Sequence, residues 1–205
     1  MFVTFEGTEG SGKTTQIPLL AAFLREQGFS VLETREPGGT AIAEQIRNVL
    51  HDVENTAMTS ETEILLYSAA RAQHVGELIK PALKAGQIVL CDRFADSTMA
   101  YQGHGRQLNL DHLTYITQFA TGGLTPDVTF FFELDIEAGL KRRVQGELEM
   151  NRMDMQKRSF YERVSQGYEA LITADPGRWQ RIDANQPIDT IQAELQTLIL
   201  TKLNT

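Results

Sequence analysis

The chain has 205 residues, a length that suits one domain with a full hydrophobic core. Its 19 basic and 27 acidic residues give a net charge of −8, which argues against non-specific binding to nucleic acid or to acidic membranes. No apolar run approaches the roughly 18 residues that a membrane-spanning helix needs. The single cysteine, Cys91, lies in an apolar run, and no signal-peptide pattern precedes the first strand, so we expect a cytoplasmic location.

Strand and helix patterns alternate along the chain without a repeat or linker. Short apolar runs predict strands at 2–6, 30–34, 87–91, 128–134 and 178–182. Amphipathic segments predict helices at 13–27, 40–52, 61–84, 109–120, 136–145, 156–173 and 187–203. Because Ile88–Cys91 and Phe130–Phe132 are apolar on successive residues, both faces of those strands must be covered. The predicted fold is α/β, with a five-stranded parallel sheet between two layers of helices.

The first strand runs directly into the sequence Gly7-x-x-x-x-Gly12-Lys13-Thr14. This pattern at a strand-to-helix junction predicts a P-loop, whose backbone N–H groups surround the phosphates of a nucleoside triphosphate. Lys13 is expected to reach the β- and γ-phosphates and Thr14 to bind Mg²⁺. The alternative is a glycine-rich turn without a ligand. The residues assigned to phosphate binding are Gly7, Thr8, Glu9, Gly10, Ser11, Gly12, Lys13, Thr14 and Thr15.

Charged residues also follow the second and third strands, where ligands bind in parallel sheets. Arg35-Glu36 precedes a Pro-Gly-Gly turn, and taken alone this pair could equally be two solvated charges. Asp92 ends an apolar strand, a position from which a carboxylate commonly holds Mg²⁺, and Arg93 would then lie near phosphates. A salt bridge at the strand end is the alternative for this pair.

Two further segments carry candidate functional residues. Tyr67 and Arg71 are four residues apart and share a helix face, so they could stack on a base and donate to its carbonyl group. Ordinary packing is the more common reason for such a pair. The basic segment at 141–163 could be an amphipathic surface helix, or an arginine-bearing lid, at about 141–157, that closes over phosphates.

Together these motifs resemble those of the bacterial thymidylate kinases, from the first strand to near the end of the chain. The matching stretches are Phe5–Thr15, Thr34–Thr40, Tyr67–Arg71, Asp92–Arg93, Ala100–Gly103, Pro126–Asp127 and Asn151–Asp154. The resemblance implies a P-loop NTPase fold and transfer of the γ-phosphate of ATP to dTMP, with Mg²⁺ as the cofactor. It also implies a homodimer of single-domain chains, the domain spanning residues 1–205.

The resemblance further implies a role for each matching residue of the acceptor site. Tyr67 would stack on thymine, Arg71 would hydrogen-bond the base, and Arg93 would hold the acceptor phosphate. Tyr101 would crowd the 2′ position of the sugar and Glu9 would approach its 3′-hydroxyl. The base pocket would be completed by Ser97, Thr98 and Gln102.

The source of catalytic positive charge distinguishes two types within the family. Some members carry an arginine inside the P-loop, where this chain has Gly10. The resemblance therefore implies that Arg142 and Arg152 of the lid supply the charge, and that Glu36 lies near the phosphates and metal. Two alternatives stay open: a P-loop kinase for another deoxynucleotide or deoxynucleoside, and a P-loop NTPase switch, although the chain has no Asn-Lys-x-Asp guanine-reading motif.

Overall fold

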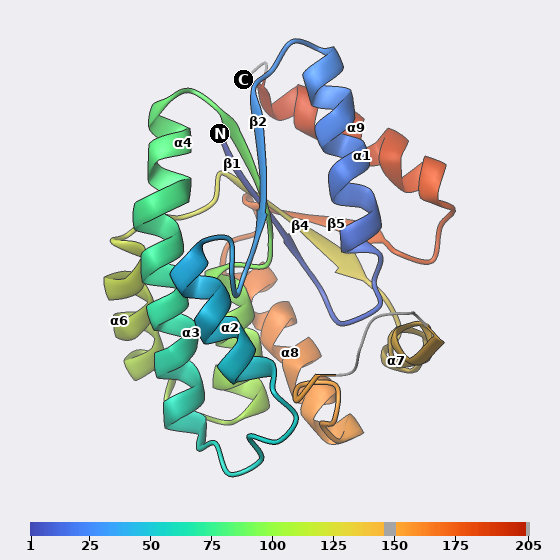
Figure 1. Cartoon of the computed structure of the whole chain (residues 1–205). Helices are drawn as coiled ribbons and strands as arrows, with labels where there is room; N and C mark the ends of the chain where they lie inside the picture. The colour runs from blue at the N-terminus through green and yellow to red at the C-terminus, as the bar shows by residue number, and fades with distance from the viewer. Residues whose placement is uncertain (146–150, 204–205) are drawn as a thin grey trace.

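A parallel sheet of five strands, in the order β2-β3-β1-β4-β5, forms the centre of the molecule (Figure 1). The computed structural model describes residues 1–145 and 151–203. The strands are β1 (Phe2–Glu6), β2 (Val31–Arg35), β3 (Ile88–Asp92), β4 (Val128–Glu133) and β5 (Trp179–Asp183). All of these strands were predicted to within one residue at each end. The shift of one residue makes Arg35 and Asp92 the last residues of their strands.

Helices cover both faces of this sheet. They are α1 (Lys13–Glu26), α2 (Ala41–His51), α3 (Ser60–His74), α4 (Lys80–Lys84), α5 (Ala95–Thr98), α6 (Leu110–Thr121), α7 (Ile136–Gln145), α8 (Arg158–Ala174) and α9 (Ile188–Leu203). Two π-helical segments, η1 (Val75–Ile79) and η2 (Met99–Gly105), continue α3 and α5. None of the helices in the described part of the chain is long and apolar enough to cross a membrane.

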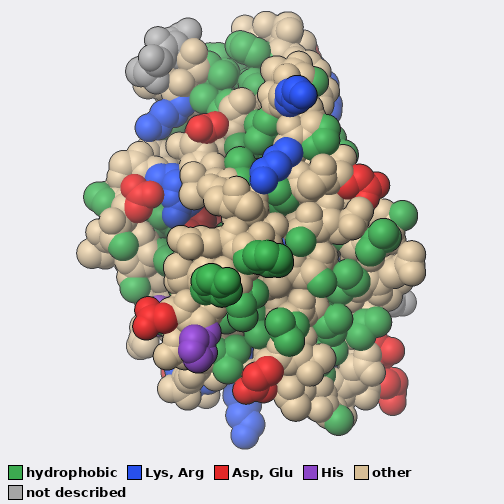
Figure 2. All heavy atoms as spheres, turned by 90° about the vertical axis from the view of Figure 1, so that its left-hand side faces the viewer, with side chains coloured by type: hydrophobic (Ala, Val, Ile, Leu, Met, Phe, Trp, Pro, Cys, Tyr) green, Lys and Arg blue, Asp and Glu red, His purple; other side chains and the backbone are tan. Residues whose placement is uncertain are grey.

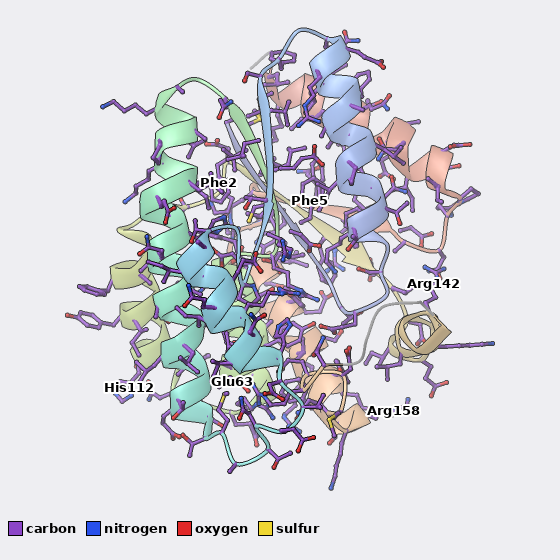
Figure 3. The ribbon with its side chains drawn as sticks, in the orientation of Figure 1. Phe2, Phe5, Glu63, His112, Arg142 and Arg158 are labelled. Atoms are coloured by element: carbon purple, nitrogen blue, oxygen red, sulfur yellow. The ribbon has the colours of Figure 1, made fainter. Side chains whose placement is uncertain are left out.

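The two faces of the sheet have separate hydrophobic cores. Helices α1 and α9 lie on one face and pack with Phe5, Phe130 and Phe132 (Figure 1). Phe2 points to the opposite face, as Figure 3 shows, and packs there with side chains of η1 and β3. This arrangement confirms the prediction of a three-layer α/β fold, because both faces of the apolar central strands are covered.

The segment 95–105 corrects the prediction, which placed no helix there. Its sequence is polar and contains Gly103 and Gly105, so it lacks the periodic apolar pattern of a surface helix. The structure shows that η2 packs tightly against α8. A Cβ atom on Gly105 would lie 2.6 Å from the ring of Phe160. Tertiary packing, which the local sequence does not report, therefore makes this segment helical.

Sheet topology brings the candidate residues together. Strand β1 lies between β3 and β4, so the chain leaves β1 at the point where the strand order reverses. All pairings within the sheet are parallel, and the P-loop, Asp92 and Arg35 therefore lie at one edge. Such switch points are where open α/β sheets bind their ligands.

Candidate active site

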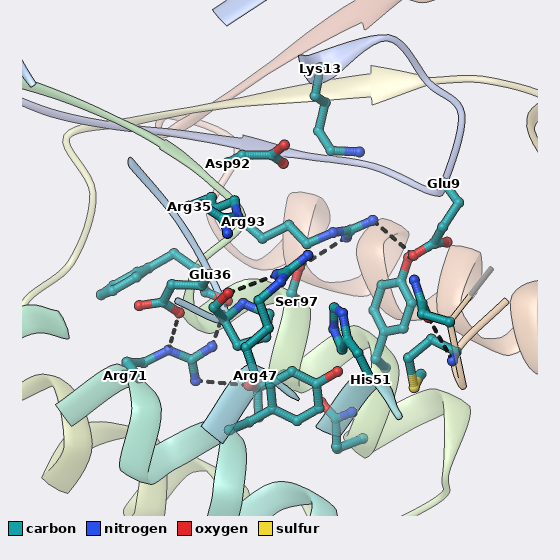
Figure 4. A pocket seen from close by; sticks show the side chains of 18 of the residues that line it. Glu9, Lys13, Arg35, Glu36, Arg47, His51, Arg71, Asp92, Arg93 and Ser97 are labelled. Atoms are coloured by element: carbon teal, nitrogen blue, oxygen red, sulfur yellow. Dashed lines mark hydrogen bonds and ion pairs between the residues drawn. The ribbon is translucent and has the colours of Figure 1, made fainter. Parts of the chain in front are cut away.

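A cavity of about 370 Å³ opens at the carboxyl ends of β1, β2 and β3 (Figure 4). It brings together the P-loop, the end of β3 and the inner faces of α2, α3 and η2. The predicted site residues that line it are Glu9, Gly10, Lys13, Thr14, Glu36, Tyr67, Arg71, Asp92, Arg93, Ser97, Thr98, Tyr101 and Gln102. The other predicted P-loop residues, which are Gly7, Thr8, Ser11, Gly12 and Thr15, lie in the loop or at the start of α1 beside it.

The P-loop owes its shape to glycine. Gly7, Gly10 and Gly12 have φ angles of 138°, 73° and 91°, a region that residues with a Cβ rarely adopt. Helix α1 begins at Lys13, so its first N–H groups and its positive dipole end face the loop. The loop is therefore built to hold an anion.

Lys13 is folded back over the loop. Its Nζ donates to the carbonyl oxygens of Gly7 and Thr8, at 3.1 and 3.0 Å, and to Ser11 Oγ at 3.0 Å. Burial, together with the nearby charge of Arg93, lowers the pKa of Lys13 to about 8. An incoming phosphate would offer this ammonium group a charged partner in place of neutral oxygens.

Asp92 and Thr14 form an oxygen pair beside the loop. Thr14 Oγ1 lies 3.4 Å from Asp92 Oδ2, and Asp92 Oδ1 is a buried atom with no hydrogen-bond partner in the described structure. Hydroxyl and carboxylate oxygens suit Mg²⁺, which commonly takes one or two protein ligands and completes its shell with water and phosphate. The described residues contain no cluster of three or more His, Cys, Asp or Glu side chains that could hold a metal alone. The pair fits a magnesium ion that arrives with a nucleotide.

Arg93 occupies the centre of the cavity. Its backbone has a φ of 67°, and its N–H donates to the carbonyl oxygen of Phe5 on β1. The guanidinium donates from Nη2 to Glu9 Oε1 at 3.1 Å and lies 5.0 Å from the centre of the Tyr101 ring. The Tyr101 hydroxyl in turn donates to Glu9 Oε2 at 2.8 Å. Glu9, Arg93 and Tyr101 thus form one network that faces the loop.

The far end of the cavity is lined by Tyr67 and Arg71 of α3, as their spacing predicted. Arg71 is 2% exposed, and each of its three nitrogens donates a hydrogen bond. The acceptors are Glu36 Oε2 at 2.7 Å, Thr98 Oγ1 at 2.8 Å and the carbonyl oxygen of Phe94 at 3.0 Å. A guanidinium has five N–H groups, so two donors stay available for a ligand.

Glu36 lines the cavity between Arg71 and the end of β3, and its backbone N–H donates to the carbonyl oxygen of Asp92 (Figure 4). Its predicted role near the phosphates and metal stays a prediction. One carboxylate oxygen accepts from Arg71 and the other lies 3.1 Å from His74 Nδ1. A buried carboxylate requires a paired cation, and Arg71 supplies it. The short sequence around Glu36 could not reveal this partner, because Arg71 comes from another helix.

The two arginines that were predicted to lie in a lid do not line the cavity. Arg142, on the exposed side of α7, donates to the carbonyl oxygen of Ala184 at 3.1 Å. Arg152 is buried; it donates to the carbonyl oxygen of Leu50 at 2.9 Å and lies 2.6 Å from Glu63 Oε2. Residues 146–150 of the predicted lid lie outside the described residues.

Several cavity residues were not predicted. Arg47 and His51, four residues apart on α2, both line the wall, and their helical spacing was a usable signal. Arg47 Nη1 donates to the carbonyl oxygen of Pro37 at 2.7 Å. Burial and the charge of Arg47 lower the pKa of His51 to about 4, so the imidazole is neutral at physiological pH. Arg35, Asn151 and Met153 complete this side of the cavity.

A P-loop lies beside an oxygen pair that suits Mg²⁺, and it faces a second subsite of arginine and tyrosine. This arrangement defines a P-loop phosphotransferase with a small acceptor. The family model described as thymidylate kinase matches residues 5–195. On this match, and on the relatives below, the chain belongs to the thymidylate kinase family.

Curated relatives and a solved structure agree with this family. The chain is 48% identical to the thymidylate kinase of Geotalea daltonii, over 99% of this chain and 98% of the relative. It is 47% identical to that of Bacillus licheniformis, over 97% of this chain and 94% of the relative. The crystal structure of thymidylate kinase from Ehrlichia chaffeensis matches with a TM-score of 0.80 and 33% identity, over 97% and 98% of the two chains.

Proposed function

We propose that this chain transfers the γ-phosphate of ATP to dTMP, giving dTDP for dTTP synthesis. The observation that supports this most directly is one cavity that joins the P-loop to the subsite of Tyr67 and Arg71. The two ends of the cavity suit the two substrates: an anion-binding loop for ATP, and an aromatic ring with a guanidinium for a planar base. The working unit is a single nucleoside-monophosphate kinase domain of residues 1–205 with a lid at about 141–157.

On the donor side, the P-loop backbone and Lys13 bind the β- and γ-phosphates of ATP. Thr14 and Asp92 hold Mg²⁺, which supplies positive charge to the phosphates when it is bound with the nucleotide. Lys13 turns from the loop oxygens to the phosphates, because an anion stabilises its charged form.

On the acceptor side, Arg93 holds the phosphate of dTMP and Tyr67 stacks on thymine. Arg71 donates its two remaining N–H groups toward the base. Glu9 and Tyr101, which hydrogen-bond each other, contact the sugar. The side chains that complete the base pocket are Ser97, Thr98 and Gln102.

The chemical step needs no general base. A phosphate monoester has a second pKa of about 6, so the acceptor is mostly a dianion near neutral pH and is already deprotonated. What remains for the protein is to place two repelling phosphates in line and to neutralise the charge that develops between them. Lys13 and Arg93 do this from the cavity, and Arg142 and Arg152 belong to the lid that closes it. Closure also excludes water and so limits hydrolysis of ATP.

A coupled assay of ADP release tests this function. The panel is ATP with dTMP, dUMP, dCMP, thymidine or no acceptor. We expect dTMP to be preferred, and Arg71→Ala to raise the KM for dTMP while the KM for ATP stays unchanged. Equal rates with dTMP and thymidine would support the nucleoside kinase instead. ADP release that needs no acceptor would support the NTPase switch.

The chain also exposes an apolar surface to which we propose that a second copy of the chain binds. Helices α3 and α6 contact each other, and they expose Leu65 (57%), Tyr115 (74%) and Phe119 (82%). Figure 2 shows hydrophobic side chains gathered on this face of the molecule. Exposed apolar patches of this kind mark protein interfaces. A homodimer through this face is proposed on these grounds.

Analytical ultracentrifugation tests the homodimer. The wild type should sediment as a dimer and Phe119→Glu as a monomer, because a charge in an apolar interface is destabilising. A dimer that Phe119→Glu leaves intact would exclude this face. A cytoplasmic location is proposed from the substrates, ATP and dTMP, and cell fractionation checks it.

A further inference from the structure

Glu6 is a fully buried carboxylate directly behind Arg93 that the proposed mechanism leaves without a role. It ends β1, one residue before the P-loop. Three groups donate to it: the Phe94 N–H to Oε1 at 2.8 Å, and the hydroxyls of Ser97 and Tyr168 to Oε2 at 2.6 and 2.7 Å. The donors come from the loop after β3, from α5 and from α8, so Glu6 ties the segment that carries Arg93 to both helices.

Glu6 sets the polarity of the two hydroxyl groups. Ser97 Oγ and Tyr168 Oη lie 3.1 Å apart and can share a hydrogen, but an ionised carboxylate is the stronger acceptor. When both hydroxyls donate to Glu6, their lone pairs are left for other donors. Arg93 Nη1 uses these lone pairs, at 3.2 Å from Ser97 Oγ and 3.3 Å from Tyr168 Oη. The orientation of the guanidinium therefore depends on a carboxylate that it does not touch.

We infer that Glu6 is a positioning residue for Arg93: by accepting from Ser97 and Tyr168, it turns both hydroxyls into acceptors that hold the guanidinium toward the acceptor phosphate. This inference rests on the proposed function, in which Arg93 binds that phosphate. The loss of Glu6 would thus impair the acceptor subsite and leave the ATP subsite intact.

The protonation state of Glu6 leads to a second expectation, that binding of dTMP depends on pH. Burial, and then the charge of Asp96, raise the pKa of Glu6 to about 7, against the opposing effect of Arg93. The charged and titratable groups around Glu6 are Lys13, Cys91, Arg93, Asp96 and Tyr168. A protonated Glu6 donates its own O–H to one of the two hydroxyls, whose hydrogen then turns to the other hydroxyl or toward Arg93, and this weakens the pair of acceptors that holds Arg93. Binding of dTMP should weaken as the pH falls through about 7.

Glu6→Gln is the decisive variant. The Phe94 N–H needs an acceptor, so the amide oxygen takes the place of Oε1 and the NH₂ group takes that of Oε2. Both hydroxyls then accept from the amide. One of their hydrogens can lie between Ser97 and Tyr168, and the other turns toward Arg93. At about pH 8, where Glu6 is mostly ionised, we expect the KM for dTMP to rise about tenfold or more and the KM for ATP to stay unchanged. Tyr168→Phe removes one acceptor only and should give a smaller rise, about threefold, in the same KM.

Asp96→Asn is the matched control. Asp96 is also a buried carboxylate, but its partner is Arg178, at 2.6 and 2.9 Å, and neither residue lines the cavity. The KM for dTMP should be normal at about pH 8. In the wild type the KM for dTMP should rise as the pH falls and Glu6 takes up a proton. Because the charge of Asp96 raises the pKa of Glu6, this rise should occur at lower pH in Asp96→Asn. It should be absent in Glu6→Gln. A further change in this KM, which comes from protonation of the dTMP phosphate near pH 6, should remain in every variant.

The outcomes separate this inference from the proposed function. No dTMP kinase activity in the wild type would refute the function. A Glu6→Gln enzyme with a normal KM for dTMP, or with equal rises in both KM values, would overturn the inference while the function stands. If Glu6→Gln does not fold, an unchanged KM for dTMP in Tyr168→Phe overturns it equally.

Discussion

The backbones of Gly10 and Gly139 are in direct contact, which joins the P-loop to helix α7. A Cβ atom on Gly10 would lie 2.3 Å from the carbonyl oxygen of Gly139, and one on Gly139 would lie 2.7 Å from that of Glu9. Gly10 also has a φ of 73°. Arg142 follows one helical turn after Gly139, and its Cβ atom would lie 3.3 Å from a Cβ atom on Gly10. The loop cannot carry an arginine of its own at position 10, and α7 brings one beside it instead.

Gly10→Ala should reduce turnover because the added methyl group displaces α7. A displacement of about 1 Å near a reaction centre can lower kcat by about 10²-fold. Gly86→Ala is the control: its φ is 78°, but an added Cβ would meet no atom within 4 Å, so it tests backbone strain alone. Steady-state kinetics and thermal unfolding of both variants check this. Equal losses of kcat in the two variants would refute the role of the contact.

Arg142→Ala should lower kcat by about 10²-fold or more, the range for an arginine that neutralises charge in phosphoryl transfer. Among the described residues, the guanidinium bonds the carbonyl oxygen of Ala184, a neutral partner that a γ-phosphate could replace. Lys141→Ala removes an exposed neighbouring charge and should leave kcat unchanged. Single-turnover measurements of dTDP formation check this. A kcat of Arg142→Ala close to that of the wild type would exclude Arg142 from the chemical step.

Arg152→Ala should chiefly lower stability. Its partner Glu63 is 1% exposed and also bonds Arg106, at 3.1 and 3.0 Å, and Gln102 at 2.8 Å. Burial alone would raise the pKa of Glu63, but these hydrogen bonds and the charges of Arg106 and Arg152 hold it below the ordinary value. Removal of one partner from a buried ion pair costs about 3 kcal/mol.

Urea denaturation checks this expectation, with Arg158→Ala as the control. Arg158 pairs with Glu162 and Glu137 at an exposed position, where loss of an ion pair changes stability little. If Arg152→Ala has a normal free energy of unfolding and a kcat lowered about 10²-fold, Arg152 acts in the chemical step and not in stability.

The parts of the site that the sequence predicted are contiguous in the chain. The P-loop and Asp92-Arg93 each lie at the end of one strand, so a local pattern defines both their identity and their place in the sheet. The pairing of Glu36 with Arg71 could not be predicted, because it joins two elements 35 residues apart. Burial of Arg152 against Glu63 depends in the same way on a distant helix. Local motifs predict which groups meet a ligand, while tertiary packing decides which groups bind each other.

Binding of ATP should take up a proton at alkaline pH. Burial lowers the pKa of Lys13 to about 8 in the free enzyme, so its amine is mostly neutral above that pH. Below about pH 8 Lys13 is charged in both the folded and the unfolded chain, and its burial then lowers the free energy of unfolding. This destabilisation is lost as the pH rises from about 8 to the unfolded pKa of about 10.5. The phosphates of ATP favour the ammonium form and should raise the pKa again.

Calorimetry in two buffers of different ionisation enthalpy measures the protons that Lys13 takes up. We expect uptake near zero at about pH 7 and approaching one proton for each ATP at about pH 9. Lys13→Arg is the matched control, because a guanidinium keeps its charge across this range and should show no alkaline uptake. The same uptake in wild type and Lys13→Arg would assign the proton to another group. A pH-independent value near zero in the wild type would mean that Lys13 is already charged when ATP binds.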